Sequence, residues 1–149
     1  MSLYQARFAH LKEKPIWKPG DTIHRGDLIG KIGETGKCYG VHLHFDLLQK
    51  EVKMPYRLRH IADYIYDLSK LMEQYNYFLD DEMFDGEYWI TTSFGDPDYD
   101  FPEWQFHPGF DIVSKKNLVY WNRSYPGKVK DVNFDAPGYG NYIIITYEV

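Results

Sequence analysis

The hydrophobic pattern of this 149-residue chain changes its period twice, and this change limits the folds that the chain can adopt. Residues 3–49 and 88–149 alternate short apolar runs with turns rich in Gly, Pro and Asp, which is typical of β-strands. Between them, over residues 56–79, apolar residues recur at spacings of three and four, the period of an amphipathic helix. The pattern predicts a mainly β, antiparallel domain with one long α-helix.

In the second β segment, the clearest strand candidates are residues 88–92, 110–113 and 142–147. We expect the helix to pack on the body of the domain, and self-association with the helix of a second chain is the alternative. The acidic residues 80–87 are expected to form a loop. The helical stripe consists of Leu58, Ile61, Ile65, Leu68, Met72, Tyr75 and Leu79.

Composition excludes several classes of protein. No apolar run approaches the ~20 residues that span a bilayer. The single cysteine, Cys38, rules out an internal disulfide framework and a zinc knuckle built on several cysteines, and we expect it to be a small buried residue. Residues 1–60 hold 11 Lys and Arg against 6 Asp and Glu, whereas residues 61–100 hold 1 against 11. With a net charge of -5, the chain is not expected to bind nucleic acid, and the two charged blocks should attract each other or face water.

His42 and His44 are the most informative local feature of the chain. In a β-strand, residues i and i+2 point to the same face, so the two imidazoles should project side by side. Leu43 and Phe45 would then enter the opposite, apolar face. Two neighbouring imidazoles can share one zinc ion, or one can bind the metal while the other moves a proton.

His107 and Asp111 form a second pair of candidate ligands. The spacing i, i+4 in an extended chain returns both side chains to one face, and an imidazole and a carboxylate both suit zinc. Two histidines and one carboxylate would leave the fourth zinc position open for water, as in catalytic sites. His10 supplies a further imidazole for proton transfer or hydrogen bonding.

Five motifs spread over about 100 residues closely resemble those of the lysostaphin/LytM-type zinc endopeptidases. They are residues 30–36 with 41–46 (Ile-Gly, Thr-Gly, His-Leu-His-Phe), 92–95 (Ser-x-Phe-Gly), 107–111 (His-x-Gly-x-Asp), 139–145 (Tyr-Gly-Asn) and 8–11 (Ala-His-Leu). Residues 50–87, which include the predicted helix, have no counterpart in the family pattern.

The order of the motifs departs from that family. There the His-x-Gly-x-Asp motif comes first and the His-Leu-His motif ends the domain, whereas here the order is reversed. Joining Val149 to Leu3 would restore the family order. The chain therefore resembles a circular permutation of the peptidase domain, a single domain over residues 1–149 in which the helix of residues 56–79 is the linker between the old ends. Assembly of the site between two chains by strand exchange is the alternative.

The resemblance implies a role for each residue that matches a motif. One Zn²⁺ per active site would be bound by His107, Asp111 and His44. The two catalytic histidines that do not bind metal would be His42 and His10. Asp46 stands where the family usually has Glu, at a position that is not a ligand. Tyr39 and Tyr139 are expected to contact the substrate.

The resemblance implies a zinc-dependent endopeptidase that hydrolyses peptide bonds of bacterial peptidoglycan, in the stem or in the cross-bridge. Two alternatives are a non-catalytic module that binds cell-wall peptide and a lytic structural component of a phage or prophage particle. The first residues lack the apolar stretch of a secretory signal, so we expect a cytoplasmic protein that acts on the cell wall once released or carried on a phage particle.

Overall fold

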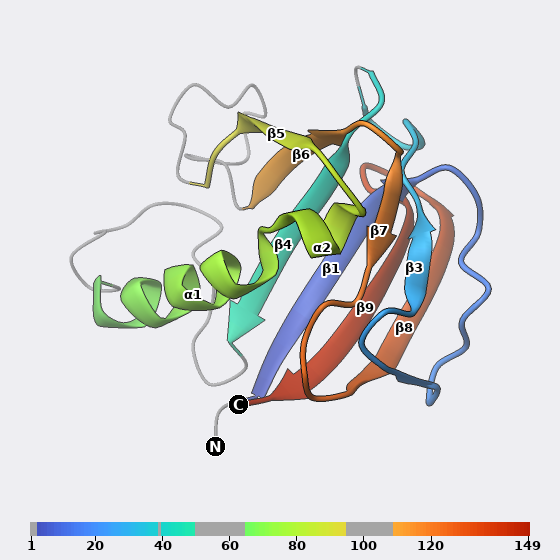
Figure 1. The fold of residues 1–149 in the computed structure, drawn as a ribbon. Helices are drawn as coiled ribbons and strands as arrows, with labels where there is room; N and C mark the ends of the chain where they lie inside the picture. Colours follow the sequence, from blue (N-terminus) through green and yellow to red (C-terminus); the bar gives the residue numbers. More distant parts are fainter. Residues whose placement is uncertain (1–2, 39, 50–64, 95–108) are drawn as a thin grey trace.

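The computed structural model describes residues 3–38, 40–49, 65–94 and 109–149 (Figure 1). A large sheet has the strand order β2-β8-β9-β1-β4-β6-β5, β3 and β7 form a second sheet, and every strand pairing is antiparallel. The mainly β, antiparallel prediction is therefore confirmed. The elements are β1 (Leu3–Leu11), β2 (Thr22–Ile23), β3 (Leu28–Lys31), β4 (Leu43–Gln49), α1 (Ile65–Phe78), α2 (Asp81–Phe84), β5 (Tyr88–Thr92), β6 (Phe110–Ser114), β7 (Leu118–Tyr120), β8 (Gly127–Ala136) and β9 (Gly140–Glu148).

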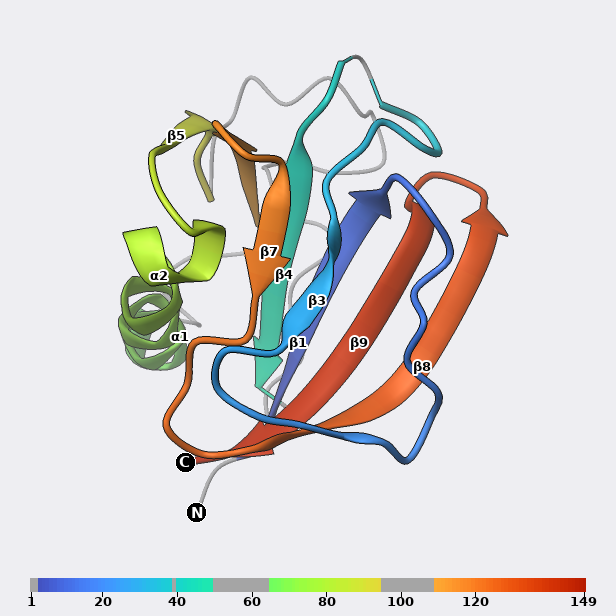
Figure 2. The ribbon, with the colours of Figure 1, turned by 45° about the vertical axis from the view of Figure 1, so that its right-hand side comes forward.

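The hydrophobic core joins the two sheets and α1. Figure 2 shows β3 and β7 in front of the large sheet, with α1 and α2 to one side. Phe78 at the end of α1, Trp121 after β7 and Tyr147 on β9 pack with ring centroids 5.4 to 5.6 Å apart. All three rings are almost completely buried, so they tie the helix and both sheets into one core.

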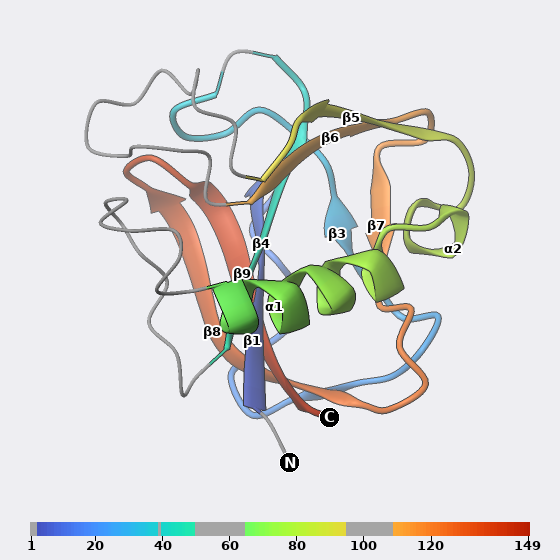
Figure 3. The same cartoon turned by 90° about the vertical axis from the view of Figure 1, so that its left-hand side faces the viewer.

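Helix α1 packs on the body of the domain, as its apolar period predicts (Figure 3). The Tyr75 ring lies against Phe45 and Phe110, at centroid distances of 5.6 and 4.8 Å. The backbone N–H of Leu47 donates a hydrogen bond of 2.7 Å to the Tyr75 hydroxyl oxygen. Residues 56–64 of the predicted helix lie outside the described residues, and the proposed linker role and self-association stay predictions.

The prediction that residues 80–87 form a loop is wrong, because α2 occupies part of this segment. Asp80 caps the helix by accepting a hydrogen bond of 2.9 Å from the backbone N–H of Met83. Met83 and Phe84 are buried and hold α2 against the core. Glu82 forms a two-pronged ion pair with Arg25 at 2.6 and 2.7 Å, which joins the acidic and basic blocks as expected.

The two ends of the described chain lie side by side. Leu3 at the start of β1 pairs with Glu148 at the end of β9 (Figure 1). This adjacency is what the permuted motif order requires, and the permutation itself stays a prediction. None of the helices in the described part of the chain is both long and apolar enough to cross a membrane.

Candidate active site

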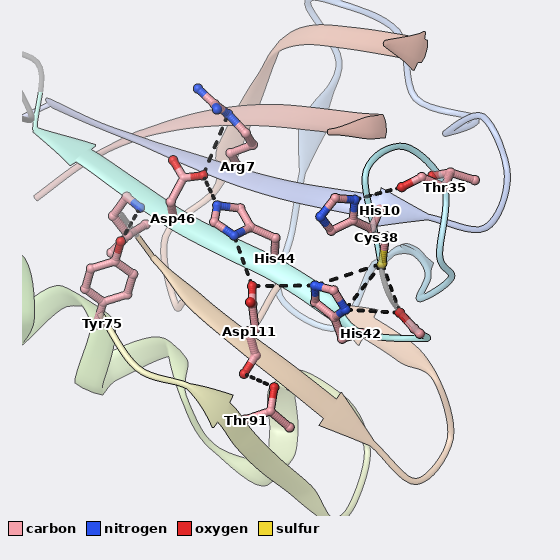
Figure 4. A network of polar contacts seen from close by, with 12 residues as sticks. Arg7, His10, Thr35, Cys38, His42, His44, Asp46, Tyr75, Thr91 and Asp111 are labelled. Atoms are coloured by element: carbon pink, nitrogen blue, oxygen red, sulfur yellow. Dashed lines mark hydrogen bonds and ion pairs between the residues drawn. The ribbon is translucent and has the colours of Figure 1, made fainter. Parts of the chain in front are cut away.

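The pairing of β4 with β6 places His44 directly opposite Asp111. The His44 Nδ1 atom lies 3.1 Å from the Asp111 Oδ1 atom (Figure 4). On both sides of His44 the buried Leu43 and Phe45 turn to the core, in agreement with the alternation of the sequence. A side chain at Gly109 would meet the Phe45 carbonyl oxygen at 2.5 Å, so glycine allows the close approach that brings the two polar groups together.

His42 approaches the same carboxylate from just before β4. Its Nε2 atom is 3.6 Å from Asp111 Oδ1, and its Nδ1 atom is 3.1 Å from the Gly40 carbonyl oxygen. The backbone N–H of His42 donates to the Gly33 carbonyl at 3.1 Å, which anchors the segment. The structure thus brings both imidazoles of the His-Leu-His motif to Asp111.

His10 reaches the site because β1 is bulged at this point. Its φ of 62° lies in the left-handed region, and the register of β1 with β9 shifts between Phe8 and Leu11. The bulge aims the imidazole at the site, where its ring centroid lies 5.0 Å from that of His42 and 6.2 Å from that of His44. Burial lowers the pKa of His10 to about 4, so the ring is neutral near pH 7.

Thr35 holds the His10 ring, a role that the sequence analysis missed. The Thr35 carbonyl accepts a hydrogen bond of 2.7 Å from His10 Nδ1. The Thr35 hydroxyl donates to the Leu11 carbonyl at 2.7 Å and accepts from the Asn141 N–H at 3.0 Å. The Thr-Gly dipeptide of the family motif was the available signal in the sequence. Only the fold shows that the loop containing Thr35 packs against the β8–β9 turn.

Asp46 is a second residue whose role the sequence analysis missed. It accepts a hydrogen bond of 2.8 Å from His44 Nε2, and Arg7 Nε lies 3.9 Å from the same oxygen. Burial opposes the charged form of His44, but the hydrogen bonds to Asp111 and Asp46 outweigh it and raise the pKa of His44 to about 9. Residues 44 and 46 share one face of β4, so the i, i+2 spacing could have indicated this contact.

The His44–Asp111 pair fits a zinc ion by the chemistry and spacing of its donors. Two ligand atoms about 2.0–2.1 Å from a tetrahedral zinc lie roughly 3.3 Å apart, close to the observed 3.1 Å. The Asp46 carboxylate keeps the proton of His44 on Nε2, which leaves Nδ1 to face the metal. His107, the third predicted ligand, lies outside the described residues.

Asp46→Asn is expected to weaken zinc binding about 10–100-fold, because loss of the carboxylate makes His44 a weaker ligand. Competition for zinc with a chromophoric chelator measures the affinity. Asp46→Glu keeps the charge and should bind zinc more tightly than Asp46→Asn. Asp135→Asn, which removes an equal charge from an exposed position near the end of β8, should match the wild type. Equal affinities for Asp46→Asn and the wild type would show that the contact does not support the metal.

Of the two residues predicted to contact the substrate, the structure describes only Tyr139. Tyr139 lies beside the site, with its ring centroid 5.4 Å from that of His44 and the Arg7 guanidinium 4.3 Å from its ring centre. Tyr39 lies outside the described residues. Both assignments as substrate contacts stay predictions.

Cys38 is only half-buried, so the expectation of a buried residue is wrong. Its Sγ atom lies 2.9 Å from the Gly40 carbonyl oxygen and 3.3 Å from His42 Nδ1. Burial and the nearby carboxylates of Asp111 and Glu34 raise the pKa of the Cys38 thiol to about 11, which disfavours a nucleophilic thiolate.

Comparison with known proteins finds a similarity for the first third of the chain. Residues 2–55, which carry His10, His42 and His44, match the model of peptidase family M23. This segment of the chain is therefore similar to peptidase family M23. This match confirms the resemblance to the lysostaphin/LytM-type enzymes.

Curated relatives match a segment of similar length. The peptidoglycan DD-endopeptidase ShyB of Vibrio cholerae is 43% identical over 47 residues, 32% of this chain and 11% of that protein. The peptidoglycan DD-endopeptidase ShyA of the same organism is 42% identical over 45 residues, 30% of this chain and 10% of that protein. The chain thus covers about a tenth of the length of these relatives. No solved structure matches the chain.

Proposed function

We propose that this chain is a zinc-dependent endopeptidase that hydrolyses peptide bonds of bacterial peptidoglycan, in the stem or in the cross-bridge. The M23 segment and the names of the two DD-endopeptidase relatives support the reaction and the substrate class. The observation that carries the proposal is the meeting of His44 and Asp111 across β4 and β6, with the imidazoles of His42 and His10 beside them.

We assign the single zinc ion to His44, Asp111 and His107. Bound there, zinc would supply Lewis-acid chemistry, which lowers the pKa of a water toward ~7 and polarises a carbonyl. A set of three protein ligands is typical of catalytic rather than structural zinc sites. The buried β4–β6 pair holds two of these ligands on rigid strands, which favours a defined geometry for the reacting groups.

His42 and His10 are the groups that exchange protons in this proposal. The Thr35 carbonyl holds the proton of His10 on Nδ1, so its Nε2 atom carries the lone pair. The Gly40 carbonyl does the same for His42, whose Nε2 atom faces Asp111. Both rings can therefore accept a proton from water or, once charged, donate one to the developing oxyanion. The sequence has no His-Glu-x-x-His motif that would supply a glutamate base.

Tyr139 is proposed as one wall of the substrate site, together with Tyr39. The guanidinium of Arg7 lies over the Tyr139 ring, which limits the motion of the ring next to His44. An immobilised aromatic ring beside the zinc ligands suits an extended peptide of small residues, because it offers a flat contact surface at little entropic cost.

The same chain is proposed to be one permuted domain over residues 1–149. The pairing of Leu3 with Glu148 supports this proposal, because the family order needs the two ends to be neighbours. Strand exchange between two chains is the competing arrangement. A monomer mass by light scattering, together with one zinc per chain, would exclude strand exchange.

The runners-up are a non-catalytic module for cell-wall peptide and a lytic component of a phage or prophage particle. The first is disfavoured, since each of the five positions implied by the family holds a residue of the right type: His10, His42, His44, His107 and Asp111. The second combines the same activity with a role in assembly. This role in assembly agrees with the location that we propose, in which the protein stays in the cytoplasm until it is released or carried to the cell wall.

The proposal is tested with zinc-loaded protein and purified peptidoglycan. We expect the turbidity of cell walls to fall, a chelator to stop the fall, and added zinc to restore it. Mass spectrometry of the soluble fragments identifies the bond that is cut. Binding to cell walls without release of peptide fragments, at full zinc occupancy, would instead establish the non-catalytic module.

A further inference from the structure

We propose that Cys38, His42 and His10 form a second cation site, which takes a soft divalent ion such as Zn²⁺ or Cd²⁺ and whose occupation inhibits the enzyme. This site shares no ligand with the zinc centre assigned to His44, Asp111 and His107. The binding of the ion is independent of catalysis, whereas inhibition rests on the proposed peptidase function.

The geometry of the three side chains carries the proposal. One ligand atom from each residue lies within 4.8 Å of the other two. Cys38 Sγ and His42 Nδ1 are 3.3 Å apart. At metal bonds of about 2.3 Å to sulfur and 2.0–2.1 Å to nitrogen, two tetrahedral ligand atoms lie roughly 3.3–3.6 Å apart. The Cys38–His42 pair therefore has nearly the required spacing, and His10, whose ligand atom lies within 4.8 Å of the other two, would complete the set by moving closer to them.

His10 gives independent support for a ligand at this position. Its side chain is buried, at 5% exposure, and is held in place by the β1 bulge. Of its two ring nitrogens, only Nδ1 has a hydrogen-bond partner within the described ranges, the Thr35 carbonyl. A buried imidazole with an unused Nε2 lone pair is an available metal ligand whose orientation is already fixed.

The donor set selects the kind of ion. One sulfur and two imidazole nitrogens favour zinc, cadmium or copper(I) over the hard ions magnesium and calcium, which prefer oxygen ligands. Coordination displaces the proton of the Cys38 thiol, which the Gly40 carbonyl accepts as a hydrogen bond in this structure. The released proton passes to solvent.

Occupation of this site would remove both proposed proton carriers. A metal on Nδ1 of His42 forces the ring proton onto Nε2, the atom that faces Asp111. His42 then cannot accept a proton from a water at the zinc centre. His10 loses its free lone pair to the same ion. The zinc centre itself stays intact, so the inhibited enzyme keeps its zinc.

The test titrates Cd²⁺ into the full chain loaded with one zinc. Because Cys38 is the only cysteine, an ultraviolet thiolate-to-cadmium charge-transfer band reports this site alone. We expect the band to saturate at one cadmium per chain with zinc retained, and to be absent in Cys38→Ser. His42→Ala and His10→Asn should each weaken cadmium binding at least about tenfold, and asparagine tolerates the left-handed φ at residue 10.

The inhibition is measured as the fall in cell-wall hydrolysis relative to the cadmium-free rate of each protein. Cadmium should inhibit the wild type over the concentrations at which the band grows, and Cys38→Ser should need at least about tenfold more. A band of unchanged affinity in His42→Ala and His10→Asn would overturn the proposal, since the thiol would be acting alone. A chain that forms the band but cuts no peptide would refute the peptidase function and leave the cation site standing.

Discussion

His42→Ala and His10→Asn are expected to hydrolyse peptidoglycan about 10²–10⁴ times more slowly than the wild type while they hold the same amount of zinc. Neither side chain belongs to the assigned ligand set, so metal content should not change. The two ring centroids nevertheless lie 5.0 Å from each other, and both rings are near the assigned ligands. The His10 centroid is 6.2 Å from that of His44, and His42 Nε2 is 3.6 Å from Asp111. Loss of either ring removes a proton carrier from the reacting water.

The measurement pairs the rate of fragment release with zinc analysis of the same samples. Asparagine is chosen at residue 10 because it adopts a φ of 62° with less strain than alanine. The control is His24→Ala, since His24 is an exposed residue in the turn between β2 and β3. Wild-type rates in both site variants would refute their assignment. A rate loss that follows zinc loss would make these histidines ligands instead.

The strand pattern could be predicted from the sequence because alternation and turn residues are local signals. Residues 88–92, 110–113 and 142–147 all lie in strands of the structure. The apolar period also predicted the helix, of which residues 65–78 are described as α1. The sequence analysis missed the short helix α2, because its acidic residues suggested an exposed loop. Its two apolar residues, Met83 and Phe84, are buried by tertiary contacts that no local pattern predicts.

The site was predictable where spacing along one strand fixes it, and unpredictable where strand pairing fixes it. The i, i+2 rule predicted that His42 and His44 share a site, and both lie near Asp111, although His42 falls just before β4. The hydrogen bond between Thr35 and His10 depends on a bulge in β1, and no local sequence pattern predicts a bulge. The contact of Cys38 with His42 depends on the path of a glycine-containing loop, which the sequence does not specify.

The second large effect is expected from Phe45→Ala, which should lower the free energy of unfolding by about 3–5 kcal/mol. Phe45 is fully buried on β4, between His44 and Asp46. Its ring packs against Phe8 and Phe78 at centroid distances of 5.1 and 5.2 Å. The cavity would therefore open where β1, β4 and α1 meet. Since domains are stable by about 5–15 kcal/mol, this loss is a large share of the total.

Urea unfolding followed by fluorescence measures the change, and the midpoint of thermal unfolding should fall by roughly 6–20 °C. Phe134→Ala is the matched control, because this phenylalanine on β8 is 63% exposed and its removal should alter stability by no more than about 0.5 kcal/mol. Zinc affinity should also fall in Phe45→Ala, since the same strand positions His44 opposite Asp111. If Phe45→Ala unfolds at the same urea concentration as Phe134→Ala, then the aromatic cluster beneath the site does not hold β4 in register.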